Sequence, residues 1–437
     1  MAVWYFVLER LLQRLPLDPF HPALLGQAFN SMAEHLMAGR FDLDPDAIGG
    51  EAFEVGDRTV SYFGIFCALL RLPLLPFPAL AHLDITRLSC LFAVCLGGWF
   101  QLRAVLLVRD TSPAGPRRDW LTAALIVCIL LGGQQIQFLR ASIYQEIVDW
   151  ANALAMGFVF LATRGLIKGF SVGTLTGMAV FAGLALLDRV SFGVGLYAAL
   201  SGVLLLRWRL ALLPALTLLV FAVAVGIVNY GRWGDPSVFA DFTKYALNQD
   251  QTPERLDHLS AYGAFNWRRI GFGLRYYFLP YGQTLFAEAR TAMIDVMELP
   301  PGSFFLSDPL LLGLTCAFAY NAMTIKGRWL SSALLLGLAL PPILMLSAIS
   351  MSYRYREEFY PFLILAALLG FRGLCRNPSP FGRKVRAAIA AAVIVSVLVS
   401  HAMAALYAVI PFGSAEQYIA KDGWIGTYAP RLRAGHD

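Results

Sequence analysis

Long apolar segments constrain this chain more than any other feature of its sequence. A helix needs about 20 mostly apolar residues to cross a bilayer. Such runs recur along the 437 residues, of which 58% are hydrophobic, too large a share for the surface of a soluble protein. They are apolar on every face, unlike the alternating strands of a transmembrane barrel. Ten segments are expected to span the membrane: 87–108, 120–139, 149–163, 170–187, 190–206, 210–230, 306–325, 329–350, 359–371 and 385–410.

The chain is therefore predicted to be an all-α polytopic membrane protein with about 10 to 12 transmembrane helices. Residues 1–410 are expected to form a single transmembrane domain, with a first outer loop at 13–86 and a large outer loop at 231–305. A loop as long as the second one is expected to hold short helices on the outer face. Whether residues 1–12 form a full span or a half-inserted helix stays open, because only about eight of them are apolar before Glu9.

Charge between the spans predicts the orientation. Alternate loops are basic and are expected to face the cytoplasm. The loops between them carry the acids and are expected on the periplasmic or extracellular face, as is the tail 411–437. The net charge of +6 thus indicates topology in a cytoplasmic (inner) membrane, and no nucleic-acid partner is predicted. The residues of the basic loops are Arg109, Arg117, Arg118, Arg164, Lys168, Arg207, Arg209, Lys326, Arg328, Arg372, Arg376, Arg383 and Lys384.

Within the first outer loop, residues 23–40 have the periodicity of an amphipathic surface helix with Gly39 as its stop. The apolar segment 61–83 holds three prolines and Arg71, so we expect it to be interfacial or re-entrant, with a kinked span as the alternative.

Between these two segments, six acids crowd residues 42–57, and Glu34 lies just upstream. The spacing Asp42-x-Asp44-x-Asp46 is that of a calcium loop, but Ala47 and Phe53 stand where such a loop needs glycine and glutamate. A DxD motif of soluble nucleotide-sugar transferases would need an α/β domain that the sequence lacks. No metal site is therefore predicted here, although a divalent cofactor stays open. The six cysteines are scattered without a CxxC pair, so neither zinc nor disulfides are expected.

Other charged residues stand at the outer ends of the spans. Glu146 and Asp149 share one helix face in IYQEIVDW. Asp188 and Arg189 lie between two short spans. In SYRYREEF, arginines suit bidentate contact with a phosphate, and the tyrosines suit a sugar or a prenyl chain. The predicted substrate-binding residues are Arg354, Arg356, Tyr353, Tyr355, Glu357, Arg189, Asp149 and Arg71.

The order of several phrases resembles a known group of enzymes. AEHLMAGRFDLDP, SYFGIFCALLRLP, IYQEIVDWANAL, GLALLDR, NYGRWGDP and SYRYREEFYPFL are similar to bacterial membrane proteins grouped with the protein mannosyltransferases and aminoarabinose transferases of the GT-C superfold. The likeness covers most of residues 20–372.

This resemblance implies a glycosyltransferase that takes a sugar from a polyprenyl-phosphate donor at the outer face and passes it to an unknown acceptor. Basic residues would hold the phosphate, and an acid of the first outer loop would act as general base. The sequence departs from the family's pattern because Leu24 and Leu25 stand about where the catalytic acid is expected. The candidates are therefore Asp42, Asp44 and Glu146, with Asp18 as a further alternative. A transporter or flippase of a lipid-linked anion, and a non-catalytic envelope-assembly protein, are the alternative functions.

Overall fold

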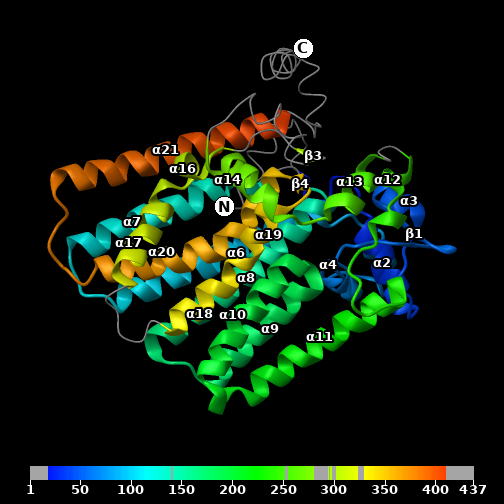
Figure 1. Ribbon diagram of the computed structural model, residues 1–437, viewed down its shortest axis with the longest axis horizontal. Helices are drawn as coiled ribbons and strands as arrows, with labels where there is room; N and C mark the ends of the chain where they lie inside the picture. Colours follow the sequence, from blue (N-terminus) through cyan, green and yellow to red (C-terminus); the bar gives the residue numbers. More distant parts are fainter. Residues whose placement is uncertain are drawn as a thin grey trace.

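The computed structural model describes residues 18–138, 141–250, 254–279, 294, 296–297, 302–322 and 329–409. These residues form a bundle of long helices with short helices and two small sheets gathered at one end (Figure 1). We call this the outer end, because the acidic connections lie on it. The predictions for residues 1–12, for the tail 411–437, and for Lys326 and Arg328 fall outside the described residues.

Each of the ten predicted spans corresponds to a helix or to a pair of consecutive helices. Six helical segments are long and apolar enough to cross a membrane, and residues 172–188, 190–206 and 309–320 form shorter apolar helices. The prediction of an all-α polytopic membrane protein is thereby confirmed. The helices of the bundle are α6 (Thr86–Asp110), α7 (Pro116–Leu131), η3 (Gly133–Phe138), α8 (Ile143–Lys168), α9 (Val172–Asp188), α10 (Val190–Leu206), α11 (Leu212–Trp233), α17 (Pro309–Ala322), α18 (Trp329–Leu338), α19 (Leu340–Ser347), α20 (Tyr360–Leu374) and α21 (Arg383–Val409).

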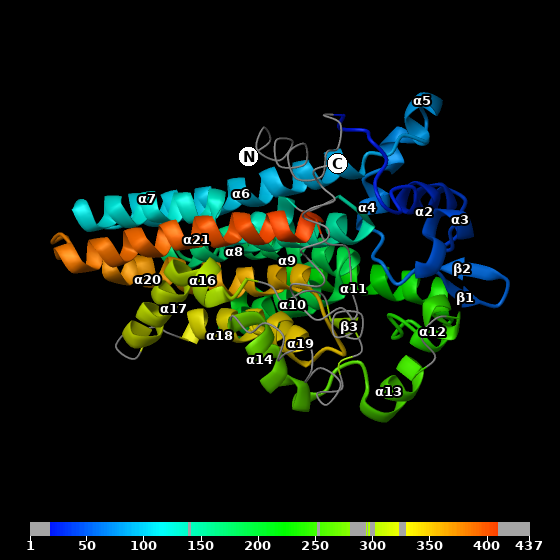
Figure 2. The same ribbon diagram turned by 90° about the horizontal axis from the view of Figure 1, so that it is seen from above.

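Helix α8 lies inside the bundle, buried over most of its length, and α6, α9 and α20 pack around it (Figure 2). Small residues allow these helices to approach closely, as is common between membrane helices. A Cβ on Gly97 of α6 would lie 3.3 Å from the Cα of Ala153 in α8. Between α18 and α10, a Cβ on Gly337 would lie 2.1 Å from the backbone nitrogen of Ala199. The glycines thus set the spacing of the helices that hold the outer end in place.

The first outer segment folds into short pieces rather than a span. The amphipathic helix expected within 23–40 is α2 (Ala28–Met37), which buries Phe29 and Met32. The apolar segment 61–83 has three short helices, as its prolines predict, and does not cross the bundle. Its elements and those before it are α3 (Pro45–Ile48), η1 (Gly49–Glu51), the antiparallel strands β1 (Phe53–Val55) and β2 (Arg58–Val60), α4 (Phe66–Leu69), η2 (Leu72–Leu74) and α5 (Pro78–Ala81).

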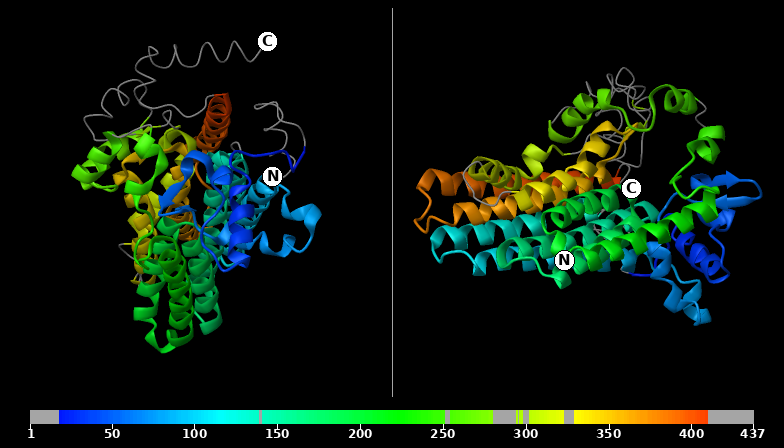
Figure 3. Two further views of the ribbon diagram at one scale, coloured as in Figure 1. Left: turned by 90° about the vertical axis from the view of Figure 1, so that its right-hand side faces the viewer. Right: turned by 60° about the horizontal axis from the view of Figure 1, so that its bottom comes forward.

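The large outer loop also forms short helices and packs on the first outer segment (Figure 3). Phe53 of β1 bridges to Tyr245, and their rings stack with centroids 4.8 Å apart. Phe265 bridges to Ala348 near the end of α19. The two outer segments therefore form one layer over the bundle. The remaining elements are η4 (Trp208–Leu210) at the opposite end, and η5 (Phe242–Lys244), α12 (Ala246–Asp250), α13 (Glu254–Tyr262), η6 (Trp267–Arg269), α14 (Ile270–Phe278), β3 (Val296–Met297), α16 (Phe304–Ser307), β4 (Ser350–Met351) and η7 (Tyr353–Phe359).

Candidate functional site

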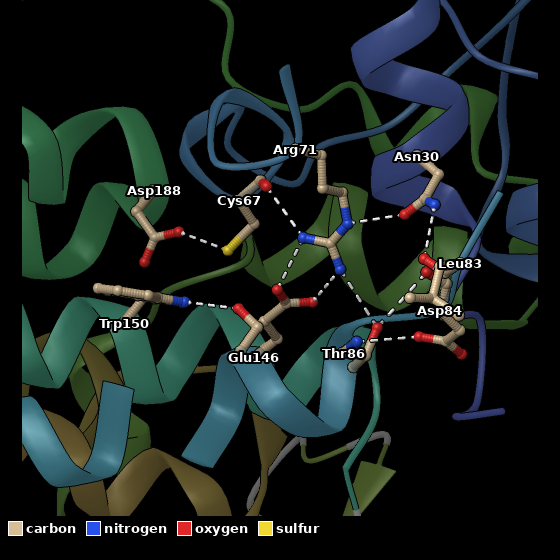
Figure 4. A network of polar contacts seen from close by, with 11 residues as sticks. Asn30, Cys67, Arg71, Leu83, Asp84, Thr86, Glu146, Trp150 and Asp188 are labelled. Carbon is tan, nitrogen blue, oxygen red and sulfur yellow. Dashed lines mark hydrogen bonds and ion pairs between the residues drawn. The ribbon is translucent and has the colours of Figure 1, made fainter. Parts of the chain in front are cut away.

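Arg71 is the centre of a buried network that ties the first outer segment to the bundle (Figure 4). Its Nη1 and Nη2 donate to the two oxygens of Glu146 at 2.8 and 2.9 Å. Its Nε donates to Asn30 of α2 at 2.7 Å, and the remaining donors reach the Cys67 carbonyl and the Thr86 hydroxyl at 2.9 and 3.3 Å. All five N–H groups of the guanidinium are thereby used. Arg71 thus joins α2, the end of α4, and the first turns of α6 and α8.

This geometry changes the interpretation of two predicted site residues. The side chains of Arg71 and Glu146 are 1% and 0% exposed, and each neutralises the charge of the other. Both oxygens of the Glu146 carboxylate accept hydrogen bonds from the Arg71 guanidinium, so neither faces an acceptor hydroxyl. The placement therefore speaks against Glu146 as a general base and against Arg71 as a ligand for substrate. Their contribution is to hold the first outer segment in place.

Asp42 and Asp44, the other predicted bases, share one histidine. His35 Nδ1 lies 2.8 Å from Asp42 and its Nε2 lies 3.3 Å from Asp44, while Arg40 reaches Asp42 at 3.1 Å. Burial raises the pKa of Asp42, but the hydrogen bond from His35 and the nearby charges lower it more, so the pKa ends below its usual value. Ser31 also donates to Asp44 at 2.7 Å. Both acids are engaged in fixing the loop onto α2.

Most of SYRYREEF is also buried. Arg356 is 0% exposed, donates to Asp308 at 2.9 Å and contacts Ser307 and the Gly302 carbonyl. The side chains of Tyr353 and Glu357 are likewise enclosed. Glu357 accepts hydrogen bonds from Gln137 and Asn152, both at 2.7 Å, and belongs to a polar network inside the bundle. Asp149 accepts from Gln145 at 2.9 Å in the same region. These predicted residues face the protein interior rather than an accessible site.

Replacing Glu357 with glutamine is expected to flatten the pH dependence of stability. Burial raises the pKa of this carboxyl from 4.5 to about 8, although the hydrogen bond from Gln137 lowers it. The folded protein thus binds this proton more tightly than the unfolded chain, and the stability gained is complete below about pH 4.5 and lost as the pH rises through about 8. Glutamine stays neutral and accepts the same hydrogen bonds.

Thermal unfolding, followed between about pH 5 and about pH 8, tests this prediction, since each unit of pKa difference corresponds to about 1.4 kcal/mol. Glu54→Gln, at an exposed position of β1, is the matched control and should keep the pH dependence of the unaltered chain. An unchanged slope in Glu357→Gln would contradict the pKa assigned to this group.

A different set of residues meets on the accessible side of the outer end, and we call it the outer cluster. Its members come from η1, the segment after β2, the first turn of α8, the α9–α10 junction and η7, and all of them are half-buried. They are Glu51, Tyr62, Tyr144, Arg189, Arg354 and Tyr355. The three acidic segments 42–57, 140–149 and 351–358 thus each contribute to one place.

Tyr144 lies between the acid and a cation of the outer cluster. Its hydroxyl donates to Glu51, and the guanidinium carbon of Arg354 lies 4.6 Å from the centre of its ring. Arg354 and Arg189 also flank Tyr355, with their guanidinium carbons 5.9 and 5.2 Å from that ring. The cluster therefore combines one carboxylate, two guanidinium groups and three phenols.

Arg189 is held so that one edge of its guanidinium stays accessible. Its Nε donates to buried Glu358 at 2.7 Å, and Ser191 donates to the same oxygen at 2.7 Å. The side chain is 20% exposed, and its two Nη groups have no hydrogen-bond partner among the described residues. A fixed guanidinium with two free donor groups matches the geometry of a phosphate.

Two phenols of this region, those of Tyr62 and Tyr245, stay protonated. Burial, and after it the charge of Glu51, raise the pKa of both Tyr62 and Tyr245 above the usual value of 10. Their hydroxyls therefore act as hydrogen-bond donors at any physiological pH. Within the described residues, no group of three or more His, Cys, Asp and Glu side chains is placed to hold a metal ion.

Sequence reasoning noted Glu51 among the seven acids but did not select it, and it missed Tyr62 and Tyr144. Tyr144 precedes Glu146 by two residues in IYQE, so the phrase pointed to the right turn of α8 but to the wrong side chain. Glu51 follows Gly49 and Gly50, and Gly49 has a positive φ of 54° that redirects the chain where η1 begins. That turn, directly before one of the six acids, is the signal that the sequence offers.

Comparison with known proteins gives distant likeness only. No protein-family model matches the sequence, and no curated protein is significantly similar to it. Among solved structures, the apo crystal structure of the Archaeoglobus fulgidus oligosaccharyltransferase has a TM-score of 0.44 and 13% identity over 96% of this chain and 57% of that chain. The archaeal oligosaccharyltransferase AglB from the same organism, in complex with an inhibitory peptide and a dolichol-phosphate, has a TM-score of 0.43 and 14% identity. That match covers 92% of this chain and 55% of that chain.

The chain thus spans little more than half the length of these structures. Likeness at this TM-score and identity is too distant to support a functional conclusion.

Proposed function

We propose that this multi-pass membrane protein is a glycosyltransferase that moves a sugar from a polyprenyl-phosphate donor to an acceptor at the outer face of the cytoplasmic membrane. The observation that carries the proposal is the meeting of Glu51, Tyr144 and Arg354, from three segments far apart in sequence. A carboxylate and a cation that contact one tyrosine supply both the base and the anion site that such a transfer needs.

The proposed roles follow from accessibility. Arg189 and Arg354 bind the donor phosphate, and Tyr355 between them lines the site. Glu51 takes the place first predicted for Asp42, Asp44 or Glu146, because those three acids are committed to His35, Arg40 and Arg71. Membrane lipid surrounds the helices, and the prenyl chain of the donor lies within it. No divalent cation is included in the proposal.

The reaction balances with these groups alone. Glu51 accepts the proton of an acceptor hydroxyl as the acceptor oxygen forms its bond to the anomeric carbon of the sugar. The bond from that carbon to the phosphate oxygen breaks, and the polyprenyl phosphate leaves with the electron pair. The guanidinium groups of Arg189 and Arg354 neutralise the charge that develops on the phosphate.

Donor binding is tested by replacing Arg354 with alanine. Hydrogen bonds to a charged group contribute about 1.5–3 kcal/mol, so the affinity for undecaprenyl phosphate should fall about tenfold to a hundredfold. The measurement is a titration of the purified protein in lipid nanodiscs with undecaprenyl phosphate. Arg189 is the poorer target, because its loss would leave buried Glu358 without its cation.

The control removes an equal charge elsewhere at the outer end. Arg268 is exposed and contacts Trp267, outside the outer cluster. Arg268→Ala should therefore bind the lipid phosphate as the unaltered chain does. Full affinity in Arg354→Ala, or an equal loss in both variants, would exclude Arg354 as the specific phosphate ligand.

A further inference from the structure

An apolar groove lies toward the opposite end of the bundle, between α7 and α21. These two helices pack side by side and both begin at the end that carries the basic connections (Figure 2). Between them lies a cavity of about 240 Å³, open to the outside and lined only by apolar side chains. Its walls include Trp120, Ala123 and Val127 of α7 and Ile389, Ala390 and Val393 of α21.

Most of α21 is exposed, so this groove opens onto the surface that faces the bilayer. Leu398 and Ile394 are 65% and 57% exposed on this helix, which passes the length and composition limits for a membrane span. Hydrocarbon is the solvent for such a surface, and an open apolar groove in it is filled by a lipid chain. Trp120, just after the first turn of α7, stands where aromatic residues mark a membrane interface.

Cationic side chains continue both walls of the groove toward the basic end. Arg386 precedes Ile389 and Ala390 by three and four residues, so it shares their face of α21. Arg117 precedes Trp120 by three residues in the same way on α7. The guanidinium carbon of Arg117 lies 4.4 Å from the ring centre of Phe381, and its buried Nε has no hydrogen-bond partner among the described residues.

The cations at the start of α21 have no acid to neutralise them. Arg383, Lys384 and Arg386 are exposed, and within the described part of the chain none of them forms an ion pair. The nearby acid of α7, Asp119, is already paired with Arg118 at 2.8 Å. The first turns of two parallel helices add the positive ends of their dipoles. The potential at this end of the groove therefore favours an anion.

We propose that the groove between α7 and α21 binds one anionic phospholipid, with an acyl chain between the helices and the headgroup phosphate against Arg117, Lys384 and Arg386. The occupant is a lipid because an apolar groove and a cationic cluster are continuous on one surface, and only an amphipathic anion satisfies both. This site is separate from the outer cluster, and it does not depend on the proposed transfer reaction.

Native mass spectrometry of the full chain, released from mixtures of phosphatidylglycerol and phosphatidylcholine, tests this site. Phosphatidylglycerol should remain bound at one molecule per chain, about tenfold more tightly than phosphatidylcholine. The exposed double variant Lys384→Gln and Arg386→Gln should lose that preference. Equal retention of the two lipids by the unaltered chain, or an unchanged preference in the double variant, would overturn the proposal.

A second pair of variants tests the groove itself. Ala390→Trp fills the space between the helices and should reduce retention of both lipids, whereas Leu398→Trp, on exposed surface of the same helix outside the groove, should not. The thermal unfolding of both variants without added lipid checks that they fold. Inorganic phosphate has no chain and should not displace the lipid. Full binding by folded Ala390→Trp, or displacement by phosphate alone, would exclude a lipid in this groove.

Discussion

Replacing Arg71 with methionine is expected to destabilise the protein by about 3–5 kcal/mol, the cost of removing one partner of a buried ion pair. Glu146 would remain at 0% exposure without its bidentate partner. Asn30 and the Cys67 carbonyl would each lose a hydrogen bond from the guanidinium as well. Thermal unfolding in lipid nanodiscs, together with the yield of monodisperse protein, measures the effect.

The double variant Arg71→Met and Glu146→Met distinguishes the cost of an unpaired buried charge from the cost of losing the other contacts of Arg71. Removing both charges leaves no uncompensated ion, so the double variant should unfold at a higher temperature than Arg71→Met alone. Arg109→Met is the control, because Arg109 pairs with Asp110 on the surface, where such pairs contribute up to about 1 kcal/mol. If Arg71→Met unfolds as the unaltered chain does, the network does not hold the first outer segment.

Replacing Glu51 with glutamine is expected to reduce sugar transfer about 10²- to 10⁴-fold, the usual contribution of a general base. Glutamine keeps an oxygen that can accept the hydrogen bond from Tyr144, so the outer cluster should keep its shape. Donor binding should be unchanged, because the two arginines remain. Turnover is measured as release of radiolabelled sugar from polyprenyl-phosphate donors in the presence of a membrane glycolipid fraction.

Asp44→Asn is the informative comparison for Glu51→Gln. Its carboxylate is 60% exposed and hydrogen-bonded to Ser31, so its loss should leave most of the turnover. The reverse outcome, an active Glu51→Gln and an inactive Asp44→Asn, would return the role of base to the acid that the sequence first indicated. Loss of donor binding in Glu51→Gln would instead make Glu51 a positioning residue.

Local patterns in the sequence predicted the helices of the bundle and their approximate ends. The sequence predicts a span at 149–163, which is shorter than helix α8 at 143–168, because Glu146 and Asp149 lower the hydropathy of its first turns. In the fold these acids are buried among polar partners, so the helix continues through them. The prolines of the segment 61–83 predicted its broken course, since a proline removes a backbone donor wherever it stands.

Site residues were harder to identify, because charge and position do not reveal which side chain is already paired. The spacing of SYRYREEF predicted two phosphate-binding arginines, and the fold buries Arg356 against Asp308 while Arg354 stays half-buried beside Tyr144. Arg354 and Arg356 are two residues apart on a 3₁₀ helix with three residues per turn, so their side chains leave the helix in different directions and meet different surroundings. The same applies to Glu146, whose partner Arg71 lies 75 positions away.

By itself the sequence determined a polytopic helical membrane protein with most acidic connections at one end, because apolar length and loop charge act locally and need no partner. Only the tertiary structure decided which acids and arginines remain available. That choice depends on contacts between distant segments, such as Arg71 with Glu146 and Glu51 with Tyr144. A buried charge must be paired, and the fold selects its partner.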